Sequence, residues 1–401
     1  MRRANYTIFS EGKIGSLKLK NRLVRSATWD PSILRSRKMN TEVLNLYQEI
    51  ALGGVGLIIT GGFPVFQEQL ANIDSKKWII NYFDLRVDEI EKLPEIVHKS
   101  QQDCKIVAQL ENGNLTGRPS VISSPYSKRK LRYLSLDEIS DIINSFVEAI
   151  IDMKKTGFDG VQLHSAHGGL LSRFLSPYTN RRNDAYGGST SNRVRIIQEI
   201  VTKARQSVSD FPILIKMNCT DYLEGGISIE TFPKLARKIE QTGVNAIEIS
   251  GGMWECLFRN EDELGFRLVP APESHTQINS IDNQSYFLKY TKKLDLDIPV
   301  ILVGGNRNIE RLEEIVKQGK VEFIALSRPI IREPDLPKRW LEGRGGPTTE
   351  CISCNSCIFA MLIHPGRSEP GLVTCVHKSN KSLHKLAQKW LSSWVKRNTI
   401  I

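Results

Sequence analysis

The 401-residue chain is predicted to fold as a (β/α)8 TIM barrel of the α/β class, followed by a short C-terminal extension that contains cysteines. Two observations predict this fold. Eight short apolar runs alternate with helical patterns between residues 23 and 327, and no Gly-x-Gly-x-x-Gly follows the first run. A doubly wound open sheet is the alternative, and the count of eight strands favours the barrel.

Each predicted strand is short and almost continuously hydrophobic, as expected for parallel strands that are buried on both faces. The strands are expected at residues 23–28, 55–60, 105–110, 160–164, 212–218, 246–250, 300–304 and 323–327. Apolar residues at helical spacing fill the gaps, at residues 41–51, 88–100, 137–155, 192–207, 230–242, 285–294 and 308–318. Ser135, with Glu138 three residues later, is a capping-box signal for one of these helices.

Active sites of such barrels lie at the carboxyl ends of the strands, and the fourth predicted strand delivers two histidines there. His164 and His167 are three residues apart, directly before a long polar loop. Both imidazoles can point into one pocket and donate hydrogen bonds to an oxygen that gains negative charge during a reaction. After the last two strands, Gly304, Gly305 and Asn306 offer backbone amides, and Ser327 precedes the cation Arg328. Phosphate groups bind at this position in many barrels.

The segment that begins at these histidines closely resembles the Old Yellow Enzyme family of flavin-dependent ene reductases. The shared motifs are His164/His167, Phe174-Leu-Ser-Pro177, Asn180-Arg-Arg-Asn-Asp184 and Tyr186-Gly-Gly-Ser189. The resemblance covers roughly residues 6–345 and itself implies the barrel fold. It implies bound FMN, NAD(P)H as the reductant, and hydride transfer to an electron-poor alkene whose oxygen is held by His164 and His167.

The resemblance also assigns positions around the flavin ring. Ser26, Ala27 and Thr28 would contact the ring, and Gly62 would pack against it. Gln109 would hydrogen-bond the pyrimidine edge, and Lys216 would lie beside N1 and O2, where a cation stabilises the reduced flavin.

One departure from the family concerns the proton donor. The family reads His-Gly-Tyr-Leu, and its tyrosine supplies the proton to the α-carbon of the substrate. Here the sequence is His167-Gly-Gly-Leu170, so Gly169 has no proton to give. Water or another acid would have to supply it. The absent phenol leaves two alternatives open, an amine dehydrogenase or demethylase and a catalytically idle electron-transfer subunit.

Four of the seven cysteines crowd into the C-terminal region, and this clustering favours a metal site over disulfides in a chain without a secretory signal. Cys351, Cys354, Cys357 and Cys375 resemble the iron–sulfur segment of two larger relatives in the family, trimethylamine dehydrogenase and 2,4-dienoyl-CoA reductase. A 4Fe-4S cluster, structural zinc and free thiols are the alternatives. We therefore divide the chain into a barrel at residues 1–345 and an extension at residues 346–401.

The composition sets limits on partners. The formal charge of +11 is interpreted as a solubility surface, because no nucleic-acid-binding motif accompanies it. No apolar run is long enough for a membrane span and the N-terminus does not resemble a signal peptide, so a cytoplasmic location is expected. The expected partner is a small-molecule substrate, without nucleic acid or membrane. An external electron donor and a homo-oligomer remain open.

Overall fold

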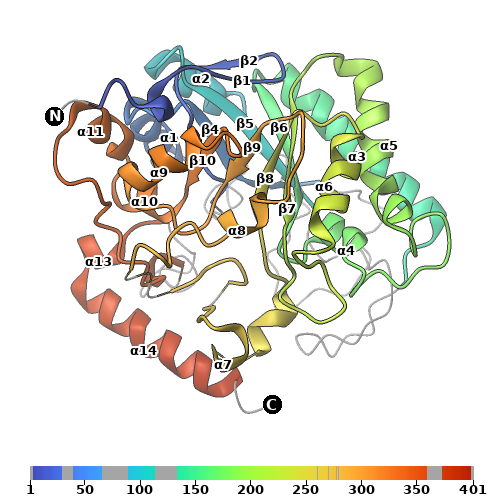
Figure 1. The fold of residues 1–401 in the computed structure, drawn as a ribbon. Coiled ribbons are helices and arrows are strands. Elements are labelled where there is room, and N and C mark those ends of the chain that lie inside the picture. Colours follow the sequence, from blue (N-terminus) through green and yellow to red (C-terminus); the bar gives the residue numbers. More distant parts are fainter. Residues whose placement is uncertain are drawn as a thin grey trace.

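A computed structural model contains a closed barrel of eight parallel strands in the order β10-β3-β4-β5-β6-β7-β8-β9 (Figure 1). The structure describes residues 3–28, 39–65, 89–112, 133–259, 261–269, 271–276, 278, 280–358 and 373–398. The barrel strands are β3 Leu23–Arg25, β4 Leu57–Pro64, β5 Lys105–Glu111, β6 Gly160–Ser165, β7 Ile213–Asn218, β8 Ala246–Ser250, β9 Val300–Leu302 and β10 Phe323–Leu326. All eight predicted strands and the (β/α)8 fold are confirmed, with strand ends that differ by up to four residues.

Six of the predicted helices surround the barrel with similar bounds. They are α1 Thr41–Leu52, α2 Lys92–Ser100, α3 Leu136–Lys155, α5 Thr190–Val208, α6 Phe232–Glu240 and α9 Ile309–Lys317. The capping box of Ser135 and Glu138 is present at the start of α3. Helix α2 begins at Lys92, and residue 88, where its start was expected, lies outside the described residues.

The predicted helix at residues 285–294 is wrong in its extent. Only α8, Leu288–Thr291, is helical there. Ser285 has a φ of 51°, in the left-handed region, so the backbone cannot continue a right-handed helix through it. Its hydroxyl instead donates to Asn306 Oδ1 at 2.8 Å, which ties the segment to the end of β9.

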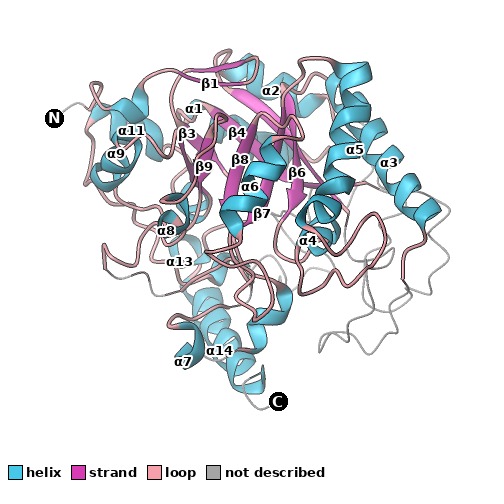
Figure 2. Cartoon of the chain, turned by 45° about the vertical axis from the view of Figure 1, so that its right-hand side comes forward, coloured by secondary structure: helices cyan, strands magenta, loops and turns pink. Residues whose placement is uncertain are grey.

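Several further elements complete the fold. The strands β1 Gly12–Ile14 and β2 Leu17–Leu19 form an antiparallel hairpin, whose apolar residues join the core inside the barrel. The remaining helical segments are η1 Thr7–Phe9, α4 Leu170–Leu175, η5 Trp254–Phe258, α7 Glu261–Leu264, α10 Arg328–Arg332, α11 Leu336–Glu342, α13 Val376–Ser379 and α14 Lys381–Asn398. Figures 1 and 2 show the hairpin at one end of the barrel and α13 and α14 at the opposite end.

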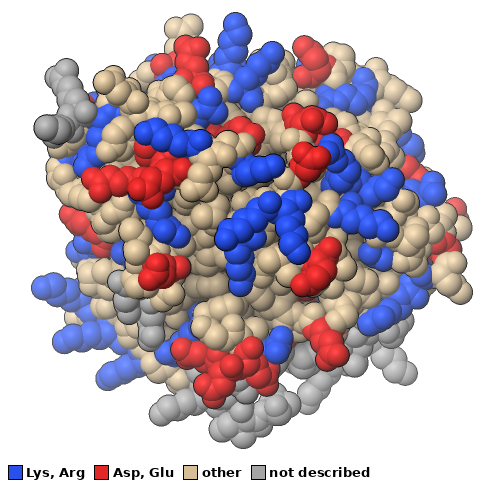
Figure 3. Space-filling view, viewed as in Figure 1, with Lys and Arg blue, Asp and Glu red and all other residues tan. Residues whose placement is uncertain are grey.

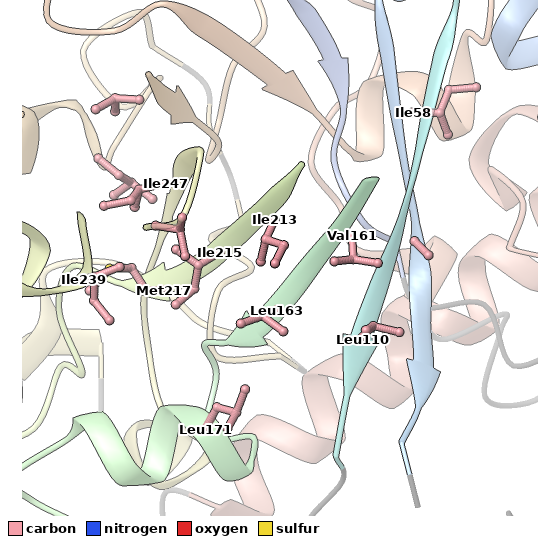
Figure 4. Close-up of a cluster of buried hydrophobic side chains, with 14 of the residues drawn as sticks. Ile58, Leu110, Val161, Leu163, Leu171, Ile213, Ile215, Met217, Ile239 and Ile247 are labelled. Carbon is pink, nitrogen blue, oxygen red and sulfur yellow. The ribbon is translucent and has the colours of Figure 1, made fainter. Parts of the chain in front are cut away.

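Alternation along the strands separates the two faces of the barrel wall. In β7, Ile213, Ile215 and Met217 pack outward with residues of the helices, and all three belong to one large buried cluster (Figure 4). The alternate residues of the same strand, Leu214, Lys216 and Asn218, therefore face the barrel interior. The same period of two places Gln109, Gln162 and Glu248 inside.

The surface carries charges of both signs. On the face drawn in Figure 3, Lys and Arg side chains are interspersed with Asp and Glu. Within the described ranges, no helix combines the length and the apolar character that crossing a membrane requires.

Candidate active site

The strand register stacks the inward-facing side chains in layers. Nearest the hairpin, an apolar layer includes Leu214, Ala246 and Ile301. Two residues further along each strand, Lys216 pairs in register with Glu248. Because side chains alternate, polar residues at these positions meet in the middle of the barrel, above the apolar layer.

Five polar residues form a buried network above this apolar layer, which we call the floor network: Ser26, Gln109, Gln162, Lys216 and Glu248. Lys216 Nζ donates to Ser26 Oγ at 3.0 Å and to Glu248 Oε1 at 3.1 Å. Gln162 Nε2 donates to Glu248 Oε2 at 2.7 Å, and Gln109 Nε2 donates to Gln162 Oε1 at the same distance. Both oxygens of the fully buried Glu248 are thus paired. The expected cation at Lys216 is present, but a carboxylate balances its charge.

His164 and His167, the imidazole pair, lie at the end of β6 with ring centroids 5.3 Å apart. His167 Nε2 is 2.6 Å from Ser250 Oγ, so Nδ1 carries the ring proton when the serine donates. The backbone of His167 is left-handed, with φ 58°, and its N–H donates to Asn218 Oδ1 at 3.1 Å. His164 Nδ1 is buried and has no hydrogen-bond partner among the described residues. The pair therefore has ring nitrogens that the described protein does not use.

Both imidazoles are neutral at neutral pH. Burial lowers the pKa of His164 well below its usual value, and the neighbouring His167 and Lys216 lower it further. Burial and then Lys216 lower the pKa of His167 in the same way. A neutral imidazole with its proton on the nitrogen that faces the cavity can donate to a substrate oxygen.

The strand ends open into a cavity of about 720 Å³. This volume lies within the range of about 300–1,000 Å³ that is typical of sites for cofactors and small molecules. All the predicted catalytic and cofactor-binding residues line it: His164, His167, Ser26, Ala27, Thr28, Gly62, Gln109, Lys216, Gly304, Gly305, Asn306, Ser327 and Arg328. The sequence motifs are therefore assembled around one chamber.

The residues at the proposed phosphate end differ in which of their polar groups remain available to a ligand. Gly304 and Gly305 are left-handed, with φ values of 104° and 72°, and a Cβ at either position would collide with Tyr286. Asn306 is committed to the barrel, because its amide donates to the carbonyls of Leu302 and Ala325. Only its backbone is left for a ligand. The guanidinium of Arg328 is oriented by the carbonyl of His275, which accepts from Nη1 at 2.8 Å.

Sequence reasoning missed two carboxyl groups that line the cavity, Glu111 and Glu273. Burial raises the pKa of Glu111 to about 7, and burial also raises the pKa of Glu273. Glu111 could have been found by extending the alternation of Val107 and Gln109 along β5. Glu273 lies in a loop and carries no periodic signal.

The C-terminal extension forms one side of the cavity. Ser353, Ile358, Val373 and Trp390 all line it. The extension is fastened to the barrel by Asn355, which donates to the carbonyls of Val269 and Ser274, and by Arg307, which donates to the carbonyl of Cys351.

The four clustered cysteines surround a second, much smaller cavity. Cys351, Cys354, Cys357 and Cys375 line a space of about 20 Å³, next to Arg328 and Arg332. Burial raises the pKa of Cys357 to about 12 and also raises that of Cys351. In the described part of the chain, no three His, Cys, Asp or Glu side chains are arranged to hold a metal ion. The other cysteines, Cys104, Cys219 and Cys256, are buried in the barrel, as expected of inert core residues.

Comparisons with known proteins agree with this geometry. The model of the NADH:flavin oxidoreductase / NADH oxidase family matches residues 7–346. An NADH oxidase of Thermoanaerobacter brockii is 33% identical over 374 residues, which are 88% of this chain and 53% of that protein. The chain thus spans about half the length of that relative.

Shorter relatives are covered almost completely. An NADPH dehydrogenase of Halalkalibacterium halodurans is 29% identical over 339 residues, 83% of this chain and 93% of that protein. The solved structure of an old yellow enzyme homologue from Zymomonas mobilis matches with a TM-score of 0.63 and 21% identity, over 85% of this chain and 94% of that one. At this identity the structural match supports the fold alone.

Proposed function

The chain belongs to the NADH:flavin oxidoreductase / NADH oxidase family, whose members are flavin-dependent oxidoreductases, and from this premise we propose that it passes hydride from NAD(P)H to an electron-poor alkene. The imidazole pair is the observation that carries the proposal. His164 and His167 line one cavity with Gln109, Lys216 and Arg328, and Ser250 occupies only one of the two ring nitrogens of His167.

The residues present fit FMN. The side-chain NH₂ group of Gln109 donates to Gln162, and no described residue donates to the side-chain carbonyl oxygen of Gln109. This oxygen can therefore accept a hydrogen bond from the pyrimidine edge of a flavin. Arg328 supplies a cation at the opposite side of the same cavity, where Gly304 and Gly305 expose backbone. Bound FMN would supply a two-electron carrier that accepts hydride from a nicotinamide and releases it to the substrate.

The protein side of the reaction follows from the hydrogen bonds. When Ser250 donates to Nε2, His167 carries its proton on Nδ1, and we expect this N–H and one of His164 to stabilise the negative charge that develops on the substrate oxygen. Because Glu248 balances Lys216, the floor network places a positive group near the flavin without an uncompensated buried charge.

The test is anaerobic reduction of the purified, FMN-loaded protein. NADH or NADPH is expected to bleach the flavin absorbance, and an enone is expected to restore it with formation of the saturated ketone. Absence of FMN uptake would contradict the proposal, and so would a reduced flavin that no activated alkene reoxidises.

A second function is an amine dehydrogenase or demethylase, and Gly169 is the observation that favours it. Without a phenol at this position, the site lacks the proton donor that alkene reduction uses in the family. The two functions can be distinguished by adding each substrate to the oxidised flavoprotein without NAD(P)H. An amine substrate would bleach the flavin absorbance, whereas an alkene would not. A catalytically idle electron-transfer subunit would respond to neither substrate, while a ferredoxin-like donor would reduce its flavin.

The cysteine cluster enters the proposal as a 4Fe-4S site, with zinc as the alternative. The four thiols share one small cavity, which supports a common ligand. Iron, sulfide and zinc analysis of anaerobically purified protein tests this. An external electron donor, a homo-oligomer and a cytoplasmic location remain predictions.

A further inference from the structure

The place of the missing phenol is open to the cavity. Gly169 caps the start of α4 with a φ of −62°, so the backbone there accepts any residue. A Cβ on Gly169 would lie 3.4 Å from the carbonyl oxygen of Ala166 and 3.4 Å from Cδ2 of His164, which is ordinary contact. The side chain is absent although the backbone would permit one, so the proton has to come from water or from another acid in the cavity wall.

Glu273 is the carboxyl group that faces the imidazole pair. Its Oε2 lies 3.9 Å from His167 Nδ1, too far for a hydrogen bond, and it has no hydrogen-bond partner among the described residues. The backbone at Glu273 is fixed, because its carbonyl accepts from the hydroxyl of Tyr286 at 2.8 Å. The carboxyl is therefore positioned beside the nitrogen that would bind a substrate oxygen.

We propose that Glu273 is the acid that gives the substrate its second hydrogen, in place of the absent phenol at position 169. This inference rests on the proposed alkene reduction. An oxygen held by both imidazoles would place the α-carbon two bonds away, inside the cavity that Glu273 also lines. The β-carbon gains the hydride, the former π electron pair forms the new C–H bond at the α-carbon, and the proton comes from the carboxyl group of Glu273, which is left as a carboxylate.

The surroundings of Glu273 suit an acid that is used and restored in each cycle. Burial raises its pKa, while the positive groups Lys216 and Arg328 and the nearby His164 act in the opposite direction. Its side chain as a whole is 34% exposed and lines the cavity, although Oε2 itself is buried, so we expect the carboxyl to regain from water the proton that NAD(P)H-driven reduction consumes. The group therefore combines a raised pKa with a place in the cavity wall.

Glu111 is the rival acid. It lies at the end of β5, where its carboxyl fills the space beside Gly62, and a Cβ on that glycine would meet Glu111 Cδ at 2.6 Å. Burial alone accounts for its raised pKa, whereas Glu273 acts electrostatically on His164. Glu273 is the carboxyl that reaches the substrate-binding nitrogens.

The experiment compares E273Q, E111Q and the double variant G169Y/E273Q in the FMN-loaded protein. An α-methyl enone is reduced in D₂O, and the product is analysed at early times. With E273Q we expect turnover to fall about 100-fold, the typical contribution of a general acid. Deuterium should then enter the α-carbon from both faces, while the face of hydride addition is unchanged. G169Y/E273Q should recover much of the rate, and E111Q should keep the configuration at the α-carbon.

A second measurement does not depend on turnover. Infrared difference spectra of the protein without substrate, recorded as the pH is raised, should show a protonated carboxyl band that persists above the pH at which an exposed glutamate loses its proton and that E273Q removes. The proposal is overturned if this band is unaffected by E273Q, if E273Q keeps both rate and α-carbon configuration, or if E111Q gives the phenotype instead. Failure of the proposed function is seen separately, because the wild-type protein would then reduce no alkene.

Discussion

The floor network and the imidazole pair are neighbouring polar groups inside the same barrel, but they differ in how far their hydrogen-bonding groups are satisfied by the protein. Each polar side chain of the floor network has a partner within it, from Gln109 at one end to Ser26 at the other. At the imidazole pair and in the loop that faces it, His164 Nδ1 and Glu273 Oε2 are buried with no hydrogen bond to any described residue.

This difference distinguishes residues that stabilise the fold from residues that bind a ligand. A buried polar group without a partner costs about 1–3 kcal/mol, whereas a paired group recovers that cost. Both residues with unpaired atoms line the cavity, and we expect a ligand bound there to pair with them. The four predictions below test this distinction, from the largest expected effect to the smallest.

The largest effect is expected from breaking the floor network. Lys216→Met would leave the carboxylate of Glu248 buried beside no cation, which costs roughly 3–5 kcal/mol. Urea unfolding of the protein without FMN measures this loss. The matched control is the double variant Lys216→Met/Glu248→Leu, which removes both charges and should regain most of the stability. A single variant as stable as the wild type would show that the ion pair is not structural.

Removing either imidazole should affect catalysis more than stability. His164→Ala and His167→Ala each delete one donor to the substrate oxygen, and we expect kcat for an enone to fall about 100- to 1,000-fold. FMN content and the urea midpoint serve as controls for folding. Equal losses of rate and of stability would place the pair with the structural residues.

The imidazole pair should also set part of the pH dependence of stability. Burial lowers the pKa of both rings, while an unfolded histidine titrates near pH 6.5. Below about pH 6.5 the unfolded chain binds protons that the folded protein does not. The free energy of unfolding therefore decreases as the pH is lowered, by up to about 1.4 kcal/mol per pH unit for each ring.

Glu111 and Glu273 act in the opposite sense, because burial raises their pKa. A comparison of wild type with His164→Gln/His167→Gln isolates the contribution of the rings. The double variant should show a shallower decline of the urea midpoint between about pH 6.5 and about pH 5. An unchanged decline would mean that the rings are protonated in the folded state.

The smallest effect is expected at Ser250. Ser250→Ala removes the hydroxyl 2.6 Å from His167 Nε2, a loss of about 1 kcal/mol, or several-fold in kcat, because the ring is freed to adopt the other tautomer. Ser250→Thr keeps the hydroxyl and should retain most of the rate. Steady-state kinetics on an enone measure both, and equal rates for all three proteins would remove Ser250 from the site.

The strands were predictable because each is an uninterrupted apolar run, and the resemblance identified the residues that line the cavity. Gln162 and Glu248 were missed although their spacing encodes them, since both fall on the inward positions of strands that were correctly located. Glu273 could not be placed, because its approach to His167 depends on a loop with no periodic pattern. The helix expected at residues 285–294 failed because Ser285 adopts a backbone conformation that its side-chain type does not signal.

The participation of Trp390 in the cavity wall has a practical consequence for the size of molecule the protein accepts. Removing the C-terminal extension, residues 346–401, would leave the predicted catalytic and cofactor-binding residues in place but would remove one side of the cavity wall. Such a trimmed protein would admit bulkier compounds and hold small ones less tightly. We therefore expect the C-terminal extension to influence which substrates the cavity accepts, although it lies far along the chain from the imidazole pair.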